Sequence, residues 1–310
     1  MEFFKKQSSI DFMGLRRYTA VMFLLLSIIS IGLLATQGLN FGLDFTGGTQ
    51  VEARFQSPIE ASLVREQLEH QGFQGVRAQQ YGSTQDILIR VANQKKDQAE
   101  EQRVTQQIKE TLLKEYPGIE IRRIEFVGSE VGEQLVEHGT IAVIVSILAT
   151  MIYIAFRFEY RLAVSAAVGL LHDAVLLLGV FSLFKFEFDL ATLASVLAVL
   201  GYSLNDTIVV FDRVRENFRK IRKGTPVEIM NLSINQTLSR TIMTSWLTLL
   251  VVLALLFFGG ESLFGFSMAF FVGIIIGTVS SIYVSGALAL WMGLSRADLM
   301  PKQKVEVNEP

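Results

Sequence analysis

The sequence predicts a polytopic α-helical membrane protein with one α+β domain inserted after its first transmembrane helix. Half of the 310 residues are hydrophobic and the mean hydropathy is +0.40, which is more apolar than an ordinary soluble domain. Charged residues are confined to particular stretches, leaving six segments that are long and apolar enough to cross a bilayer. The segment 39–137 instead carries alternating strand and helix patterns, which predicts a folded domain outside the lipid.

The six transmembrane helices follow from the need for about twenty consecutive, mostly apolar residues in each. They are expected at residues 18–38, 138–156, 162–184, 190–212, 240–259 and 263–294. The last is long enough to tilt or to continue beyond the lipid. The first could be mistaken for a signal peptide, but the sequence around Ala35 is a poor cleavage site, so we expect a retained anchor.

The distribution of Lys and Arg predicts the orientation of these helices. Basic residues gather in the leader 1–17, around the loop 157–161, in the connection 213–239 and in the tail 295–310. The alternate short loops carry only Lys185 and Glu261. Both termini are therefore expected in the cytoplasm and the domain 39–137 outside it. We interpret the basic run 213–223 as a cytoplasmic amphipathic segment lying on anionic headgroups.

The external domain is predicted to have the β-α-β-β-α-β order of the ferredoxin-like fold. Its elements are expected at 49–55 (strand), 58–71 (helix), 76–81 (strand), 86–92 (strand), 97–116 (helix) and 119–127 (strand). Ser57 and Glu60 have the spacing of a capping box, with Pro58 at the first helical position. Because no catalytic constellation is present, we expect a binding or lever module.

Composition and motifs exclude several classes of function. The net charge of -2 gives no bulk attraction to nucleic acid, and the absence of cysteine excludes disulfides and thiolate metal sites. His70, His138 and His172 are too scattered to suggest a metal cluster. The sequence has no phosphate-binding loop, dinucleotide-binding fingerprint or zinc-protease motif. We therefore expect no enzyme activity and no cofactor.

Three ionisable residues fall where lipid should not tolerate them, because a charge at a helix centre costs about 2.5–3.5 kcal/mol. Asp173 lies in the third span, Asp206 about two turns inside the cytoplasmic end of the fourth, and Arg240 at the start of the fifth. Each also has a structural interpretation. Asp173 and Asp206 could be neutral, hydrogen-bonded packing residues, and Arg240 could follow from the positive-inside rule. The functional interpretation is that Asp206 carries a proton and Arg240 is its electrostatic partner, because burial and a nearby guanidinium act oppositely on the carboxyl.

The sixth predicted span contains a ladder of small residues, Gly273, Gly277 and Ser281, which permits close approach between helices. Ordinary tight packing and a sliding contact with another helix bundle both fit this pattern.

Three motifs in this order resemble the SecF family, the smaller subunits of the bacterial SecDF accessory complex of the Sec protein translocase. They occupy residues 41–49, 201–217 and 233–241, and the resemblance covers the chain from the leader to the sixth span. The motif residues that we single out are Gly42, Asp44, Gly47, Gly48, Gly201, Tyr202, Asn205, Asp212 and Arg213.

The resemblance implies a proton-driven transporter of the resistance-nodulation-division type, in which two six-helix halves face each other. SecD would supply the other half, and Asp206 and Arg240, with Asp173 in a weaker role, would belong to the proton pathway. Protons would be the coupling ion. The implied partners are SecD, the SecYEG channel and the translocating unfolded polypeptide, in the bacterial inner membrane with the external domain in the periplasm.

Two rival functions remain open from the sequence. An intramembrane aspartyl protease would pair Asp173 with Asp206, but the surrounding residues do not match that family and the two lie at different depths. A half-transporter exporting a lipid or small molecule would have the same transmembrane machinery. Co-purification of a SecD-like chain would distinguish it from the SecF interpretation.

Overall fold

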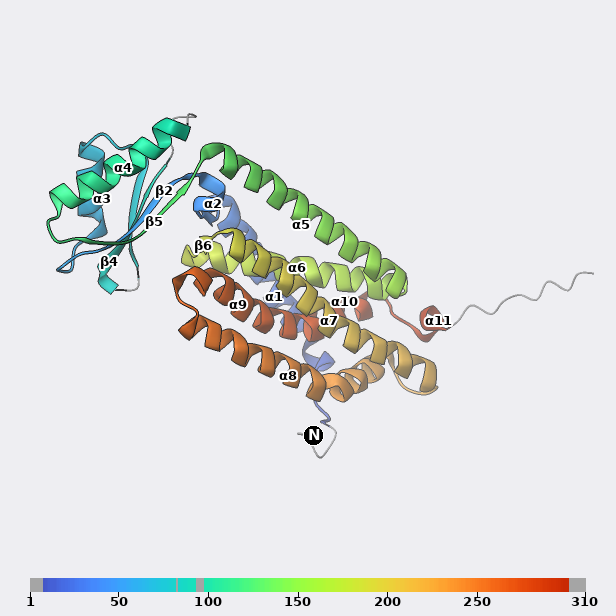
Figure 1. Ribbon diagram of the computed structural model, residues 1–310. Helices are drawn as coiled ribbons and strands as arrows, with labels where there is room; N and C mark the ends of the chain where they lie inside the picture. Colours follow the sequence, from blue (N-terminus) through green and yellow to red (C-terminus); the bar gives the residue numbers. More distant parts are fainter. Residues whose placement is uncertain (1–7, 82, 93–97, 301–310) are drawn as a thin grey trace, which may run out of the picture. The chain divides into compact units, whose positions relative to one another are not determined.

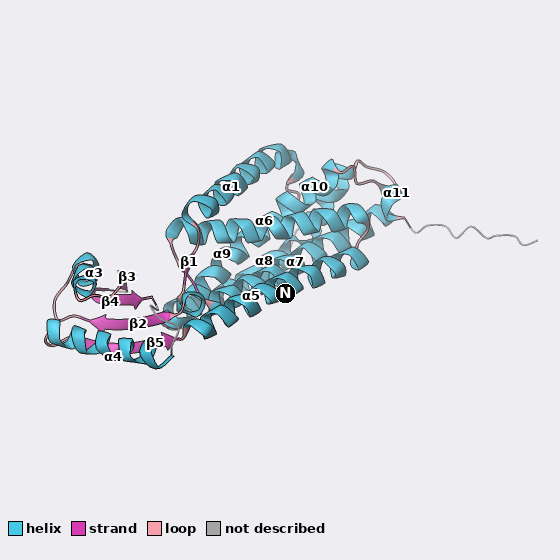
Figure 2. Cartoon of the chain, turned by 90° about the horizontal axis from the view of Figure 1, so that it is seen from above, coloured by secondary structure: helices cyan, strands magenta, loops and turns pink. Residues whose placement is uncertain are grey.

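The computed structural model describes residues 8–81, 83–92 and 98–300. It divides into two compact units, one formed by residues 1–40 and 143–310 and the other by residues 41–142. Figures 1 and 2 label the elements of both. The six helices that are long and apolar enough to span a membrane confirm the predicted fold class.

The first unit is a bundle of long helices. It comprises η1 (Met13–Leu15), α1 (Arg16–Gln37), most of the apolar part of α5 (Ser129–Arg157), α6 (Tyr160–Phe184), α7 (Leu190–Lys220), α8 (Pro226–Phe258), η2 (Glu261–Leu263), α9 (Phe264–Ser280), the π-helical η3 (Ser281–Ser285), α10 (Gly286–Trp291) and α11 (Arg296–Leu299). The two-residue strand β6 (Glu187–Phe188) precedes α7. Helices α6, α7 and α9–α10 are about half covered within the chain, whereas α1, α5 and α8 are mostly exposed. Lipid or partner helices must therefore cover the latter three.

The small-residue ladder lies inside this bundle. A Cβ atom added to Gly273 would lie 2.4 Å from Val199 Cγ1, and one added to Gly277 would lie 2.9 Å from Ser203 Cβ. Both glycines therefore allow α9 to pack closely on α7. This is the tight-packing alternative, and the glycines do not form a sliding contact with another bundle.

The connection 213–239 is helical over most of its length, where the sequence predicted a basic cytoplasmic loop. Helix α7 continues to Lys220 because Val214 and Phe218 bury their side chains in the bundle core. Helix α8 starts at Pro226, with Thr225 and Glu228 forming a capping box. An apolar count detects only the part of a helix that lipid covers, so it ended the α7 span too early and began the α8 span too late. The same limitation explains why α5 begins at Ser129 rather than at 138.

Most of the basic run 213–223 belongs to α7, which ends at Lys220, and is therefore not a separate surface segment. Arg215 pairs with Asp212 at 2.9 Å, Lys220 with Glu216 at 2.6 Å, and Arg219 with Glu159 at 3.3 Å. These ion pairs fasten the end of α7 to itself and to the start of α6.

The second unit confirms the predicted β-α-β-β-α-β order. It consists of α2 (Leu43–Thr46), β2 (Gly48–Arg54), α3 (Ala61–His70), β3 (Val76–Tyr81), β4 (Ser83–Val91), α4 (Gln98–Glu115) and β5 (Glu120–Val127), and the strand β1 (Asn40–Phe41) precedes it. The strands form an antiparallel sheet in the order β3-β4-β2-β5 (Figure 2). The cross-strand pairs Val51–Ile89 and Ala53–Ile87 share one face. That face forms a core with Val64, Leu68, Ile108 and Leu112 of α3 and α4.

The predicted start of the first helix in this unit was wrong. Helix α3 begins at Ala61, and its N-cap residue, Glu60, makes no side-chain cap hydrogen bond. The Ile59 N–H instead donates to the Thr84 carbonyl at 3.4 Å. Pairing of the backbone with β4 therefore extends residues 58–60 and displaces the helix start by one turn.

The glycine motif before β2 has a direct steric explanation. Gly47 and Gly48 have φ values of 63° and 123°, a region that side chains disfavour. A Cβ atom on Gly48 would also lie 2.4 Å from the Val91 carbonyl oxygen. Gly42 precedes the short helix α2, which contains Asp44.

Candidate functional site

Asp206 and Arg240 lie at the same level of the α7–α8 hairpin. Asp206 is 14 residues before the end of α7 at Lys220, and Arg240 is 14 residues after the start of α8 at Pro226. The two helices run antiparallel from a short turn, so equal distances bring the side chains together about 21 Å from that turn. Asp206 is thus near the middle of α7 rather than two turns from its end, since the helix is longer than the predicted span.

The Asp206 side chain is 2% exposed, and its Oδ2 atom is buried without a hydrogen-bond partner among the described residues. The Arg240 guanidinium and the Ser245 hydroxyl lie near this carboxyl. No direct ion pair joins Asp206 to Arg240 in the described part of the chain. The two side chains lie near each other without the predicted direct contact. A buried carboxyl oxygen without a hydrogen-bond donor costs free energy of folding, so its presence needs an explanation, such as a functional role.

Hydroxyl groups extend from this carboxyl across three helices. Tyr202 lies one turn before Asp206, and its hydroxyl donates to Ser245 Oγ at 3.2 Å. Ser245 is in turn hydrogen-bonded to Thr278 Oγ1 at 2.8 Å. These groups link α7, α8 and α9 beside Asp206.

Asp173 belongs to a separate polar cluster on α6. It is 2% exposed and accepts a short hydrogen bond from Ser203. Its other oxygen lies 3.2 Å from His172 Nδ1, which is 3.5 Å from Ser280 Oγ. Asp173 therefore has its own partners, and among the described residues no hydrogen bond joins it to Asp206. Two carboxyls sharing one water, as an aspartyl protease requires, do not occur in this arrangement.

One face of α7 next to Asp206 is not covered by the rest of the chain. Gly201 and Asn205, four residues apart, are exposed there, and Arg240 on α8 is exposed as well. Polar residues at such a depth in a spanning helix almost always face protein or a water-filled cavity rather than lipid. This face therefore fits another helix bundle better than lipid.

Asp212 and Arg213, the next residues of the motif, have structural roles. Asp212 pairs with Arg157 at 2.6 Å and with Arg215, whereas Arg213 pairs with Glu216 at 2.9 Å. The first contact joins the end of α5 to α7.

Sequence reasoning missed Ser203, Ser245, Thr278 and Ser280, which complete the two polar clusters. The signal was present, because hydroxyl residues within apolar spans commonly link helices. A sequence contains many such residues, however, and their helix faces become known only once the helices are packed.

Comparisons with known proteins show the family of the chain. Residues 107–295 match the family "Protein export membrane protein SecD/SecF, C-terminal", and residues 32–59 match the "SecD/SecF GG Motif". The chain is 44% identical over 300 residues to the protein translocase subunit SecF of Pseudomonas aeruginosa, covering 96% of both chains. It is 46% identical to that of Vibrio alginolyticus, covering 96% of this chain and 95% of the other.

Solved structures are similar as well. The crystal structure of SecDF, a translocon-associated membrane protein from Thermus thermophilus, matches with a TM-score of 0.83 and 36% identity. The alignment covers 94% of this chain and 39% of that one, so this chain spans well under half of the solved protein. SecDF in a super-membrane-facing form matches with a TM-score of 0.66 over 94% of this chain and 40% of the other.

Proposed function

The chain belongs to the SecF family of protein export membrane proteins, and we propose that it is a Sec translocase accessory subunit that works with a SecD partner. In this proposal the pair uses the proton motive force to help draw unfolded polypeptide out of the SecYEG channel. The chain lies in the bacterial inner membrane with both termini in the cytoplasm and residues 39–137 in the periplasm, as the Lys and Arg distribution predicts.

The buried Asp206 carboxyl is the observation that carries the proposal. The carboxyl is 2% exposed, and Arg240 lies at the same level of the adjacent helix, so Asp206 combines burial with a nearby positive charge. The unpartnered Oδ2 atom leaves room for a donor that arrives with a second state of the bundle. Asp206 thus serves as proton carrier, with Arg240 as its electrostatic partner and protons as the only coupling ion.

The exposed face formed by Gly201, Asn205 and Arg240 supports a SecD partner. A second bundle packed on it would cover these polar groups and supply further acids for the proton path. Each proton crossing releases about 2.3 kcal/mol per 100 mV. That is enough to bias a rearrangement between states that differ by a few kcal/mol.

We expect Asp206→Asn to abolish gradient-stimulated secretion in membrane vesicles while leaving assembly with SecD intact. The amide keeps size and hydrogen bonding but does not titrate. Asp173→Asn is the matched control, since it makes the same change on a neighbouring helix in an enclosed cluster, and it should retain most of the stimulation. Secretion is measured with and without a proton gradient, and assembly by pull-down.

Full stimulation with Asp206→Asn would refute the carrier role. Loss of assembly would instead assign the residue to packing. Gradient-driven transport by this chain alone in liposomes would contradict the need for SecD and favour a half-transporter.

A further inference from the structure

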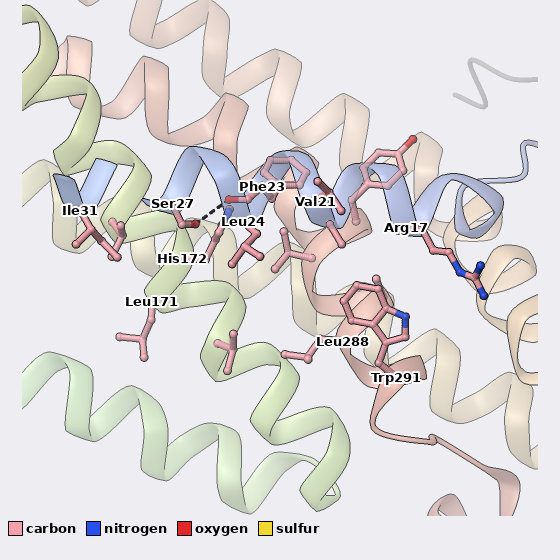
Figure 3. A pocket seen from close by; sticks show the side chains of 16 residues that line it. Arg17, Val21, Phe23, Leu24, Ser27, Ile31, Leu171, His172, Leu288 and Trp291 are labelled. Atoms are coloured by element: carbon pink, nitrogen blue, oxygen red, sulfur yellow. Dashed lines mark hydrogen bonds between the residues drawn. The ribbon is translucent and has the colours of Figure 1, made fainter. Parts of the chain in front are cut away.

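A pocket of about 600 Å³ opens between α1, α6 and η3–α10 in the first unit (Figure 3). Its walls are almost entirely aliphatic and aromatic, and include Val21, Leu24, Ile31, Val168, Leu171 and Leu288. The π-helical segment η3 contributes Tyr283 and Val284 to the wall. In a protein whose helices span a membrane, a pocket of this composition is filled by something apolar.

The two polar groups in the middle of the pocket are turned to the protein. The Ser27 hydroxyl donates to the Phe23 carbonyl at 2.8 Å, as the dashed line in Figure 3 shows. His172 directs Nδ1 toward Asp173 and packs edge-on against the Phe23 ring. The other His172 nitrogen, Nε2, has no hydrogen-bond partner among the described residues, but it is buried from solvent, so the middle of the pocket offers little that would hold a polar ligand.

One end of the pocket differs, because Arg17 and Trp291 lie there and Ile31 lies toward the other end (Figure 3). Arg17 is exposed, and among the described residues it has neither an acidic partner nor a hydrogen bond. Its neighbour Arg16 instead donates to the Met13 carbonyl at 2.8 Å, and Arg161 pairs with Asp298 at 2.6 Å. Trp291 is 54% exposed, and tryptophan is enriched where a helix meets the headgroup layer.

We infer that this pocket is a binding site for an anionic phospholipid, with an acyl chain along the aliphatic walls and the phosphate at Arg17. The unpaired guanidinium matches a phosphate in charge, and it donates hydrogen bonds in a planar fork that phosphate accepts. A basic pocket between helices at the headgroup level is the kind of site that selects anionic lipids. The inference depends on the helices spanning a membrane and not on the proton role of Asp206.

The length of the pocket fits an acyl chain as the occupant. Its lining follows α1 from Arg17 to Ile31, which is 14 residues or about 21 Å at helical rise. One leaflet is about half of the 30 Å hydrocarbon core, so an acyl chain that begins at the headgroup level can lie along these walls.

The test uses the purified full chain and phosphatidylglycerol carrying a photoactivatable group in one acyl chain. Phosphatidylcholine with the same chain is the competitor. Labelled peptides should come from α1, α6 and α10, and phosphatidylglycerol should be preferred. Arg17→Gln should weaken that preference roughly fivefold, the fold-change that corresponds to about 1 kcal/mol per basic residue near a lipid surface.

Three variants control for general effects. Arg16→Gln removes the same charge one residue away, outside the pocket lining, and should leave the preference unchanged. Arg17→Lys keeps the charge and should retain most of the preference. Ala20→Phe fills the pocket from α1 and should reduce labelling of its walls by both lipids.

Equal labelling by the two lipids, with no change in the Arg17→Gln variant, would overturn the proposal. Labelling spread evenly over α5 and α8 would also overturn it.

Discussion

At the scale of single residues, the molecule treats its two buried aspartates differently. Asp173 is enclosed by Ser203 and His172, whereas Asp206 keeps one oxygen without a donor among the described residues. A carboxyl whose hydrogen bonds are complete stabilises packing. A carboxyl that has an oxygen without a donor, beside a cation, can still accept a hydrogen bond or a proton from an incoming group.

We therefore expect Asp173→Asn to affect stability more than coupling. The amide can still accept from Ser203, but its NH₂ group would face one of the contacts that a carboxylate oxygen now makes, at a cost of about 1–3 kcal/mol. The measurement is the thermal unfolding midpoint of the purified full chain, with Ser203→Ala as a comparison. An unchanged midpoint combined with lost gradient stimulation would move Asp173 into the proton path.

Asp298 provides a pH-dependent contact outside the spans. Its pKa is held below the ordinary value chiefly because the Ser295 hydroxyl donates to it, with a further contribution from Arg161 against the opposing effect of partial burial. A lowered folded-state pKa gives stability that is present above the unfolded value of about 3.9 and is lost as pH falls through the folded value.

Docking of α11 should consequently be constant from about pH 5 to 8 and weaken below about pH 4. Hydrogen exchange of residues 295–300, corrected for the intrinsic rate, would measure the docking of α11 as a function of pH. Asp298→Asn should show reduced protection without the pH step. Weakening on the alkaline side instead would contradict the assignment.

At the scale of elements, the sequence predicted what each segment is better than where it ends. Periodicity identified all six spans and all six elements of the external domain, because alternation and apolar length are local properties. It ended α7 too early, since Val214 and Phe218 are buried by contacts from other helices, and it began α8 14 residues too late. It began α3 too early, because pairing with β4 overrides the capping signal at Ser57.

The candidate site was predicted to a similar degree. Asp206 and Arg240 are recognisable because ionisable residues in apolar spans are rare. Their common level follows from two helix lengths that depend on packing. The hydroxyls of Ser245 and Thr278 have no distinguishing sequence context, so only the folded bundle identifies them.

Gly48→Ala should severely destabilise the second unit. The new Cβ would meet the Val91 carbonyl oxygen at 2.4 Å in a left-handed backbone conformation, so strand β2 must shift from β4. Strain of this kind costs about 1–3 kcal/mol before any clash is counted. Gly72→Ala is a matched control, because its φ is also positive at 95° but nothing lies within 4 Å of the new atom.

Urea unfolding of the two variants would separate the contributions of backbone strain and steric clash. A loss for Gly48→Ala no greater than that for Gly72→Ala would show that the approach to Val91 relaxes easily.

At the scale of the whole molecule, the division into two units has a direct test. Residues 42–128 contain the complete four-stranded sheet, both long helices and the core around Val51 and Ile89. We expect this fragment to fold as a soluble unit with mixed helix and strand in its circular dichroism spectrum and a cooperative thermal transition. A disordered spectrum would show that the external unit depends on the rest of the chain.

In the proposed function, the depth of Asp206 in α7 also makes its proton occupancy depend on voltage. The residue lies 16 positions after Leu190 and only six before residue 212, where the apolar span is predicted to end. A proton that reaches it from the Leu190 side has therefore crossed roughly three-quarters of the electric field. At about 2.3 kcal/mol per 100 mV for the full crossing, this corresponds to roughly 1.7 kcal/mol, or about a 17-fold change in proton occupancy. An electrical potential alone, without any pH difference, would thus change how often this carboxyl is protonated.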